Sequence, residues 1–197
     1  MSRKELLDAI AAEIMVCCKC KLWRTRKYPV PGEGNPNSQI MFIGEAPGYQ
    51  EDVKGKPFVG AAGKFLNTLL SEAGLSRESV FIGNILKCRP PKNREPSRDE
   101  IKTCTPYLNR QIRVIQPEFI VTLGNYSTAY IFSKVALPFN GITRVHGKFY
   151  KTSILDMQVT VFPTFHPAAA LYHPKYKEQL ITDFHTLKQE LAQKRAF

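Results

Sequence analysis

The sequence contains no apolar run that approaches the roughly 18 to 20 residues of a membrane-spanning helix, and it has no repeats or low-complexity tracts. Residues 1–20 alternate charged and apolar side chains as an amphipathic helix does, without the continuous apolar segment of a secretory signal. It also lacks a carboxylate cluster suited to a two-metal hydrolase. These absences disfavour a membrane protein and metal-dependent phosphate hydrolysis, and they predict a cytoplasmic protein with no membrane partner.

Acidic side chains are scarce: 17 Asp and Glu residues stand against 28 Lys and Arg residues, which gives a formal net charge of +11. Such an excess indicates a polyanionic partner, most commonly nucleic acid, although a basic protein can also be merely soluble. The chain has 197 residues, of which 43% are hydrophobic, enough for a core and too many for wholesale disorder. We predict one domain over residues 1–197 that acts as a monomer, associated with the nucleoid.

Four of the five cysteines form two pairs that lie far apart in the chain. Cys17 and Cys20 form a C-x-x-C motif, and Cys88 and Cys104 form a looser pair. In the cytosol, where disulfides are rare, clustered cysteines more often bind metal. Four thiolates suit tetrahedral zinc or an iron–sulfur cluster, and spacing does not separate these two; four unrelated buried thiols are the plain alternative. The side chain of Cys18 should point away from any such centre.

The pattern of apolar residues predicts alternating strands and helices. Helical spacing or a capping signal marks residues 61–74, a helix after Ser97 that Pro106 must kink or restart, and the C-terminal segment. Short apolar runs predict buried strands at residues 40–44, 80–86, 119–124 and 159–165. Because buried strands that alternate with helices form a parallel sheet, we predict an α/β fold. Its expected architecture is a three-layer α/β/α sandwich with a central, mainly parallel four-stranded sheet.

Ligand sites in such sheets lie at the carboxyl ends of the strands. Asn84 lies within the second predicted strand near its carboxyl end, and the other strands run into the segments 44–48, 123–125 and 165–174. Gly60 and Gly63 open the helix that follows the first strand. Glycines at this position let backbone N–H groups approach a phosphate, but close packing of helix against strand explains them equally well.

Several long motifs resemble those of the family 4 uracil-DNA glycosylases, the iron–sulfur type found in archaea and thermophiles. They are GEAPGYQEDVKGKPFVGAAG (44–63), NILKCRPPKNREP (84–96) and HPAAALYHP (166–174), with VPGEGNP (30–36), IQPEFIVTLG (115–124), GITRVHGKFY (141–150) and the four-cysteine pattern. The resemblance covers roughly residues 15 to 188. It implies an enzyme that flips uracil out of single- or double-stranded DNA and hydrolyses the N-glycosidic bond, which leaves an abasic site for base excision repair.

The resemblance also implies a [4Fe–4S] cluster held by Cys17, Cys20, Cys88 and Cys104 as a structural staple near the DNA. Five cations around these cysteines are candidates to contact the DNA backbone, although charge runs are also typical of a solvated surface. They are Lys87, Arg89, Lys92, Arg94 and Arg98.

The chemistry of uracil recognition agrees with this resemblance. Phe58 is expected to stack on the flipped base. The Asn84 amide can accept a hydrogen bond from uracil N3–H and donate one to O4, whereas cytosine presents the opposite pattern. Backbone amides around Gly44, Glu45 and Ala46 are expected to bind the uracil oxygens.

His166 is the predicted catalytic residue, because its N–H can stabilise the charge that develops on uracil O2 when the bond breaks. A neutral imidazole is sufficient for this role. Family 1 enzymes carry an aspartate where this chain has Ala46, so Glu45 and Glu51 are the carboxylates available. Either can orient the attacking water or stabilise the cationic sugar, and Glu51 can instead exclude thymine by crowding C5 of the base.

Leu171 is the expected wedge that fills the vacated base stack, and Tyr172 stands where relatives commonly carry arginine, which makes it the alternative wedge. The C-terminal QKRAF is a candidate for docking on a sliding clamp. Two other functions remain open. A non-catalytic DNA-binding relative should lack the pair of Asn84 and His166, and a glycosylase with broader specificity for deaminated bases should lack the asparagine.

Overall fold

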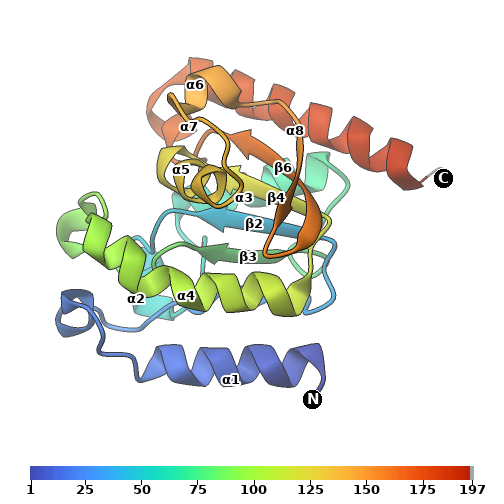
Figure 1. The fold of residues 1–197 in the computed structure, drawn as a ribbon. Helices are drawn as coiled ribbons and strands as arrows, with labels where there is room; N and C mark the ends of the chain where they lie inside the picture. Colours follow the sequence, from blue (N-terminus) through green and yellow to red (C-terminus); the bar gives the residue numbers. More distant parts are fainter. Residues whose placement is uncertain (196–197) are drawn as a thin grey trace.

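The computed structural model describes residues 1–195, which form a six-stranded sheet in the order β1-β3-β2-β4-β6-β5 (Figure 1). The four central strands run parallel, and β1 and β5 pair antiparallel at the two edges. The strands are β1 (Glu33–Gly34), β2 (Ile40–Gly44), β3 (Phe81–Asn84), β4 (Phe119–Leu123), β5 (Tyr150–Ile154) and β6 (Met157–Thr164).

The predicted parallel four-stranded centre is confirmed, and the two edge strands are additions that the apolar pattern did not reveal. β1 has only two residues, neither of them buried. In β5 only the last of the five side chains is buried. Neither strand carries the continuous apolar run that marks a strand covered on both faces, because edge strands are only partly covered.

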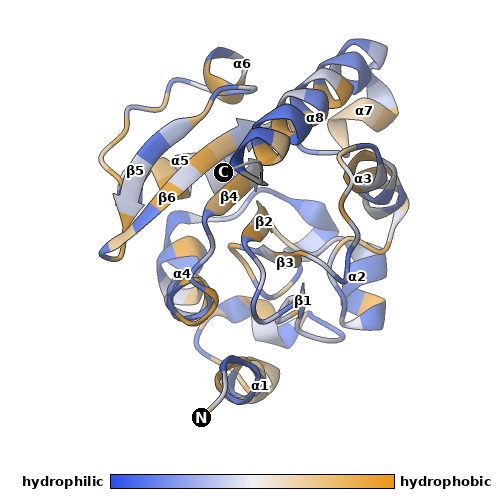
Figure 2. Ribbon diagram, turned by 90° about the vertical axis from the view of Figure 1, so that its right-hand side faces the viewer, coloured by the Kyte–Doolittle hydropathy of each residue, from blue (hydrophilic) through white to orange (hydrophobic). Residues whose placement is uncertain are grey.

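Helices cover both faces of the sheet and produce the predicted three layers. α3 and α8 pack together on one face, α4 and α5 lie on the other, and α1 packs on the outside of α4 (Figures 1 and 2). The helices are α1 (Arg3–Met15), α2 (Tyr49–Lys54), α3 (Ala61–Glu72), α4 (Arg98–Ile115), α5 (Asn125–Lys134), α6 (Ile142–Val145), α7 (Ala169–Tyr172) and α8 (Pro174–Arg195), with 3-10 turns at Lys21–Arg24 and Pro91–Asn93.

Helix α4 begins at the predicted capping box. The Ser97 hydroxyl accepts a hydrogen bond from the Glu100 backbone N–H, and the Glu100 carboxylate accepts one from the Ser97 N–H. Arg94 adds two hydrogen bonds to the same carboxylate and lowers the pKa of Glu100. The helix continues through Pro106 as a single element, so of the two predicted effects, a kink or a restart, the restart is excluded.

The core lies between the sheet and its two helical layers. Phe42, Phe119 and Phe162 from three central strands are buried, as are Leu66 in α3 and Leu187 in α8. This packing leaves the carboxyl ends of β2, β3, β4 and β6 at one end of the sheet, where the loops that follow them meet. No helix among residues 1–195 is long and apolar enough to cross a membrane.

Candidate active site

A cavity of about 320 Å³ opens at the carboxyl ends of β2, β3 and β6. Most of the residues predicted to form the site lie around it, although they come from segments that are distant in the sequence. The lining consists of Glu45, Ala46, Pro47, Gly48, Glu51, Phe58, Ala62, Asn84, Pro90, Asn93, Arg94, His166 and Ala168.

Gly44 lies beneath this cavity and allows its walls to approach one another. The parallel register of β2 and β3 places Gly44 beside Asn84. A Cβ atom on Gly44 would lie 2.4 Å from Asn84 Oδ1 and 2.7 Å from Phe58 Cζ, both too close for non-bonded atoms. Only glycine at position 44 therefore leaves room for the amide and the phenyl ring together.

Asn84 carries an unsatisfied hydrogen-bond acceptor. Its side chain is 2% exposed, and its buried Oδ1 atom has no hydrogen-bond partner among residues 1–195. A buried polar atom without a partner costs about 1–3 kcal/mol, and this oxygen is available to accept a hydrogen bond from a donor in the cavity. Backbone hydrogen bonds from Ile85 and Leu86 to the carbonyls of Gly44 and Glu45 hold the end of β3 in place.

The His166 imidazole is held in one tautomer. Its Nδ1 atom accepts a hydrogen bond from the Ala168 backbone N–H at 3.1 Å, so the proton of the neutral ring lies on Nε2. Burial lowers the pKa of His166 to about 4, although the charge of Glu51 acts in the opposite direction. The ring stacks on Phe58 with a centroid distance of 5.5 Å. Near neutral pH, His166 is therefore an uncharged hydrogen-bond donor.

The loop after β4 supports this histidine from below. Gly124 has a φ of +95°, and a Cβ atom at this position would lie 3.0 Å from the Cβ of His166. The predicted site segment 123–125 thus contributes close packing rather than a side chain that lines the cavity.

The two candidate carboxylates differ in their surroundings. Burial, followed by the negative charge of Glu95, raises the pKa of Glu45 to about 7. The Glu51 carboxylate instead accepts hydrogen bonds from three backbone N–H groups, those of Gly48 at 3.1 Å and of Val59 and Gly60 at 2.8 Å each. Glu51 therefore organises the loop around Phe58, whereas Glu45 titrates near neutrality.

Close packing explains one of the two glycines at the start of α3. A Cβ atom on Gly63 would lie 1.8 Å from the carbonyl oxygen of Phe58, an overlap that no side-chain adjustment relieves. A Cβ atom on Gly60 would lie 3.4 Å from Oε1 of Glu51, an ordinary contact, so packing does not require glycine at position 60. Of the two explanations that the sequence left open, the structure supports close packing for Gly63 rather than a phosphate site.

The four paired cysteines line a second pocket. Cys17 and Cys20 come from the segment after α1, Cys88 follows β3, and Cys104 lies in α4. No group of three His, Cys, Asp or Glu side chains within residues 1–195 is arranged to hold a single metal ion. The cysteines thus share one space without converging on a point. Cys18 is exposed and does not line the pocket, as predicted.

Two donors already contact the sulfur atoms. Arg26 donates to Cys88 Sγ at 3.1 Å, and the Lys87 backbone N–H donates to Cys104 Sγ at 3.2 Å. Burial raises the pKa of the Cys104 thiol to about 12. At neutral pH this thiol is therefore protonated.

Lys87 corrects one prediction of DNA contact. Its side chain is 1% exposed, and its ammonium group donates a hydrogen bond to Gln111 Oε1 at 2.8 Å. Burial lowers the pKa of Lys87 to about 8. The Lys87 side chain therefore belongs to the interior and does not contact DNA, whereas Lys92, Arg94 and Arg98 are exposed.

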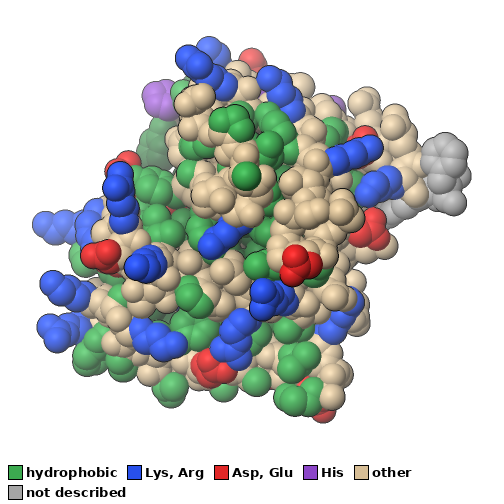
Figure 3. Space-filling view, in the orientation of Figure 1, with side chains coloured by type: hydrophobic (Ala, Val, Ile, Leu, Met, Phe, Trp, Pro, Cys, Tyr) green, Lys and Arg blue, Asp and Glu red, His purple; other side chains and the backbone are tan. Residues whose placement is uncertain are grey.

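The predicted wedge residues lie on the short helix α7, which follows the Ala168 that lines the cavity. Leu171 is 46% exposed and Tyr172 is 78% exposed, although both are large and apolar. In the space-filling view of Figure 3, Lys and Arg side chains project along the edge toward which β2 and β3 run in Figure 1. The end of the sheet with the cavity thus combines exposed apolar and cationic side chains.

Sequence reasoning missed part of the cavity wall. Pro90 and Asn93 line it from the loop before α4, and Asn93 has a φ of 55°. Asparagine tolerates this left-handed conformation better than most residues, so an asparagine within the proline-rich run PPKNREP is the signal that indicates a turn here.

A family model described as the uracil DNA glycosylase superfamily matches residues 31–188. The type-4 uracil-DNA glycosylase of Saccharolobus solfataricus is 56% identical over 95% of this chain and 88% of its own length. The chain belongs to this superfamily. The type-4 uracil-DNA glycosylase of Sulfurisphaera tokodaii is 53% identical over 93% of this chain and 84% of its own length. That of Archaeoglobus fulgidus is 49% identical over 91% of this chain and 90% of its own length. The resemblance to family 4 is thereby confirmed.

The position of Gly44 provides a direct test of the site. Gly44→Ala should lower the rate of uracil release from a deoxyuridine oligonucleotide by at least about 10-fold, because its methyl group displaces the Asn84 amide or the Phe58 ring. Gly83→Ala is the matched control, since a Cβ there makes only ordinary contacts at 3.6 and 3.7 Å. An equal loss in both variants, or wild-type activity in Gly44→Ala, would contradict this account.

Proposed function

We propose that the protein excises uracil from DNA by hydrolysing its N-glycosidic bond, without a covalent enzyme–DNA intermediate, and leaves an abasic site for base excision repair. The observation that carries this proposal is the buried, unpartnered Asn84 oxygen in the cavity that Phe58 and His166 also line. The similarity to relatives named type-4 uracil-DNA glycosylases supports it.

Recognition follows from the hydrogen-bonding pattern of the base. Uracil donates from N3–H to the free Asn84 oxygen and accepts at O4 from the amide NH₂ group. Cytosine carries an acceptor at N3 and a donor at C4, so it would leave both contacts unmade in a buried site. Stacking of a base on an aromatic ring such as Phe58 contributes about 1–3 kcal/mol. The presence of this asparagine favours uracil over the broader range of deaminated bases.

Catalysis rests on a cavity that holds a hydrogen-bond donor where charge develops. A base in a duplex must leave the stack before side chains reach its glycosidic bond. As this bond breaks, negative charge accumulates on uracil O2, and the Nε2–H group of neutral His166 stabilises it. Because the donor is fixed through Nδ1, little reorganisation accompanies the reaction.

The two carboxylates take separate roles in this proposal. Glu51 uses its oxygen atoms to hold backbone N–H groups of the Phe58 loop, so it positions the aromatic platform. Glu45 is left to orient the attacking water or to stabilise the cationic sugar, and both roles require its ionised form.

Helix α7 carries the two candidates for the wedge that fills the DNA base stack after the uracil has flipped out. Leu171 enters the vacated space in this proposal, because its apolar side chain is exposed next to the rim of the cavity. Tyr172 is more exposed and remains the alternative wedge. Lys92, Arg94 and Arg98 are exposed, Arg94 also lines the cavity, and in this proposal all three contact the DNA backbone.

The cysteine pocket fits a [4Fe–4S] cluster held by the four paired thiolates. Its donors are all sulfur, they surround a shared space, and N–H groups already point at two of them, as is common around iron–sulfur clusters. Such a cluster would supply positive iron that ionises the buried thiols and would tie the segment after α1 to α4 and to the loop after β3. It is a structural staple in this proposal.

Three further predictions remain open. They are the monomeric state, the cytoplasmic location near the nucleoid, and the docking of the C-terminal QKRAF on a sliding clamp. The last two residues of that segment, 196 and 197, lie outside the described residues.

The function is tested by single-turnover release of uracil from a single-stranded oligonucleotide that carries one deoxyuridine. The wild-type protein should release free uracil, and His166→Ala should slow this step by about 10²–10³-fold with DNA affinity nearly unchanged, because the lost contact acts on developing charge. A binding titration on the same oligonucleotide provides the control. A protein that binds this DNA and releases no uracil would be the non-catalytic relative.

The pKa of Glu45 predicts the pH dependence of the rate. Since the ionised carboxylate is required and its pKa is about 7, the rate should fall as the pH drops from 8 to 5.5. His166, with a pKa of about 4, stays neutral over this range. Glu45→Gln should be slower and should lose this dependence. Glu95→Gln should move the midpoint to lower pH, because it removes the charge that disfavours ionisation of Glu45. An unchanged profile in Glu45→Gln would assign the titration to another group.

The cluster is tested by metal analysis of protein that is purified without oxygen. The wild-type protein should be brown and contain four iron and four sulfide per chain, the definition of this cluster. Cys88→Ser should lose iron and melt at a lower temperature, while the matched control Cys18→Ser should keep both colour and melting temperature. Stoichiometric zinc without iron or sulfide would overturn the assignment.

A further inference from the structure

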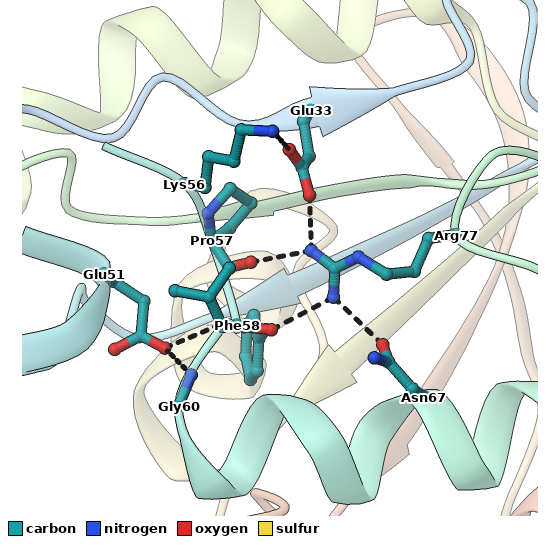
Figure 4. Close-up of polar contacts among 9 residues, drawn as sticks. Glu33, Glu51, Lys56, Pro57, Phe58, Gly60, Asn67 and Arg77 are labelled. Carbon is teal, nitrogen blue, oxygen red and sulfur yellow. Dashed lines mark hydrogen bonds and ion pairs between the residues drawn. The ribbon is translucent and has the colours of Figure 1, made fainter. Parts of the chain in front are cut away.

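Arg77 does not line the cavity, yet it contacts the backbone that carries the Phe58 ring. It lies in the turn between α3 and β3, and its side chain is 19% exposed. Its guanidinium group donates to the carbonyl oxygens of Pro57 at 2.7 Å and of Phe58 at 3.1 Å, to Asn67 Oδ1 at 3.1 Å, and to the Glu33 carboxylate (Figure 4).

The Glu51 carboxylate binds the same stretch of backbone from the opposite side. Its Oε1 atom accepts from the N–H groups of Val59 and Gly60 (Figure 4). The peptide group between Phe58 and Val59 is therefore held at both ends, because its oxygen is bound by the cation and its N–H by the carboxylate. The adjoining peptide groups are each held by one of these two charges.

The contacts of Arg77 and Glu51 together form a clamp on the backbone at Phe58, and the conformation of Phe58 explains why this clamp is needed. Its φ is 49°, in the left-handed region that large side chains rarely adopt. A residue remains there only when the surrounding structure over-determines its backbone. The Phe58 carbonyl also lies where a Cβ on Gly63 would be, so the start of α3 packs directly against it. Without a partner for this carbonyl, the backbone can relax and move the ring away from His166.

We propose that Arg77 is a positioning residue that fixes Phe58 in its left-handed conformation and so keeps the aromatic platform of the uracil site in place. The Glu33 carboxylate orients the guanidinium group by accepting its hydrogen bond. Its Oε2 atom also lies 3.9 Å from Nζ of Lys56. This inference rests on the proposed function, in which Phe58 stacks on the flipped base.

The geometry requires arginine rather than any cation. A guanidinium group has five N–H donors in a rigid fork, so one side chain can hold two successive carbonyls and still bond an amide and a carboxylate. An ammonium group offers three donors from a single nitrogen atom. Arg77→Lys should therefore retain the charge and much of the stability but lose control of the loop.

A double-mutant cycle tests whether Arg77 acts through Phe58. In single-turnover uracil release, Arg77→Ala should lower the rate by about 10²-fold, as expected when a reacting group is misplaced by about 1 Å. In the Phe58→Ala background, the same change should cost less than about 3-fold, because the ring that Arg77 positions is already gone. The matched control is Arg110→Ala, which breaks a similar two-bond contact with Glu13 away from this loop and should keep the wild-type rate.

If the rate losses of the two single variants multiply in the double variant, Arg77 acts independently of Phe58 and the proposal is overturned. A wild-type rate in Arg77→Ala would overturn it as well. Thermal unfolding identifies a variant that fails to fold. In that case Arg77→Lys takes its place and should show the same dependence on Phe58.

A measurement without substrate separates this proposal from the proposed function. Amide hydrogen exchange of Val59 and Gly60 should be at least about 10-fold faster in Arg77→Ala or Arg77→Lys than in the wild type, because their contacts with Glu51 depend on a fixed loop. The amide of Leu66 in α3 should not change and serves as the internal control. Unchanged exchange at Val59 and Gly60 would overturn the clamp even if the protein releases uracil. If Val59 and Gly60 exchange faster in the Arg77 variants but the wild-type protein releases no uracil, the clamp is supported and the proposed function is refuted.

Discussion

The parallel pairing of β2 with β3 is the constraint on which the rest of the site depends. This register sets Gly44 beside Asn84, and the missing Cβ of Gly44 leaves space that the Asn84 amide and the Phe58 ring occupy together. His166 stacks on the same ring. A shift of the register by one residue would remove the glycine from this position and would separate the groups that line the cavity.

The cavity separates its titratable groups by environment. Burial keeps His166 uncharged at neutral pH and brings the pKa of Glu45 to about 7. Glu51, which lines the same cavity, is committed to backbone N–H groups. One small space thus contains a neutral donor, a titrating carboxylate and a structural carboxylate. The side-chain types alone do not distinguish the two glutamates. The difference between the titrating Glu45 and the hydrogen-bonded Glu51 therefore follows from the folded structure.

The motifs predicted much of the site because the three that carry its residues, 44–63, 84–96 and 166–174, begin at or just after the ends of β2, β3 and β6 in the parallel centre. Phe58, Asn84 and His166 were expected to meet, and they line one cavity. The prediction failed for Lys87, which stands among arginines and prolines in the sequence but points into the interior toward Gln111. The partner that makes this burial tolerable lies on α4, and no local pattern connects the two positions.

The sequence by itself determined the parallel four-stranded centre and the basic character, because each depends on composition or on residues that are neighbours in the chain. Its motifs, through their resemblance to a known family, also indicated Phe58, Asn84 and His166 as pocket residues. Only the tertiary structure decided that Gly63 serves close packing, that Glu51 binds backbone, and that Arg77 reaches the carbonyls of Pro57 and Phe58. These contacts join segments that the periodicity of a single helix or strand does not relate. They form only when several elements pack at once, so they follow from the shape of the whole core.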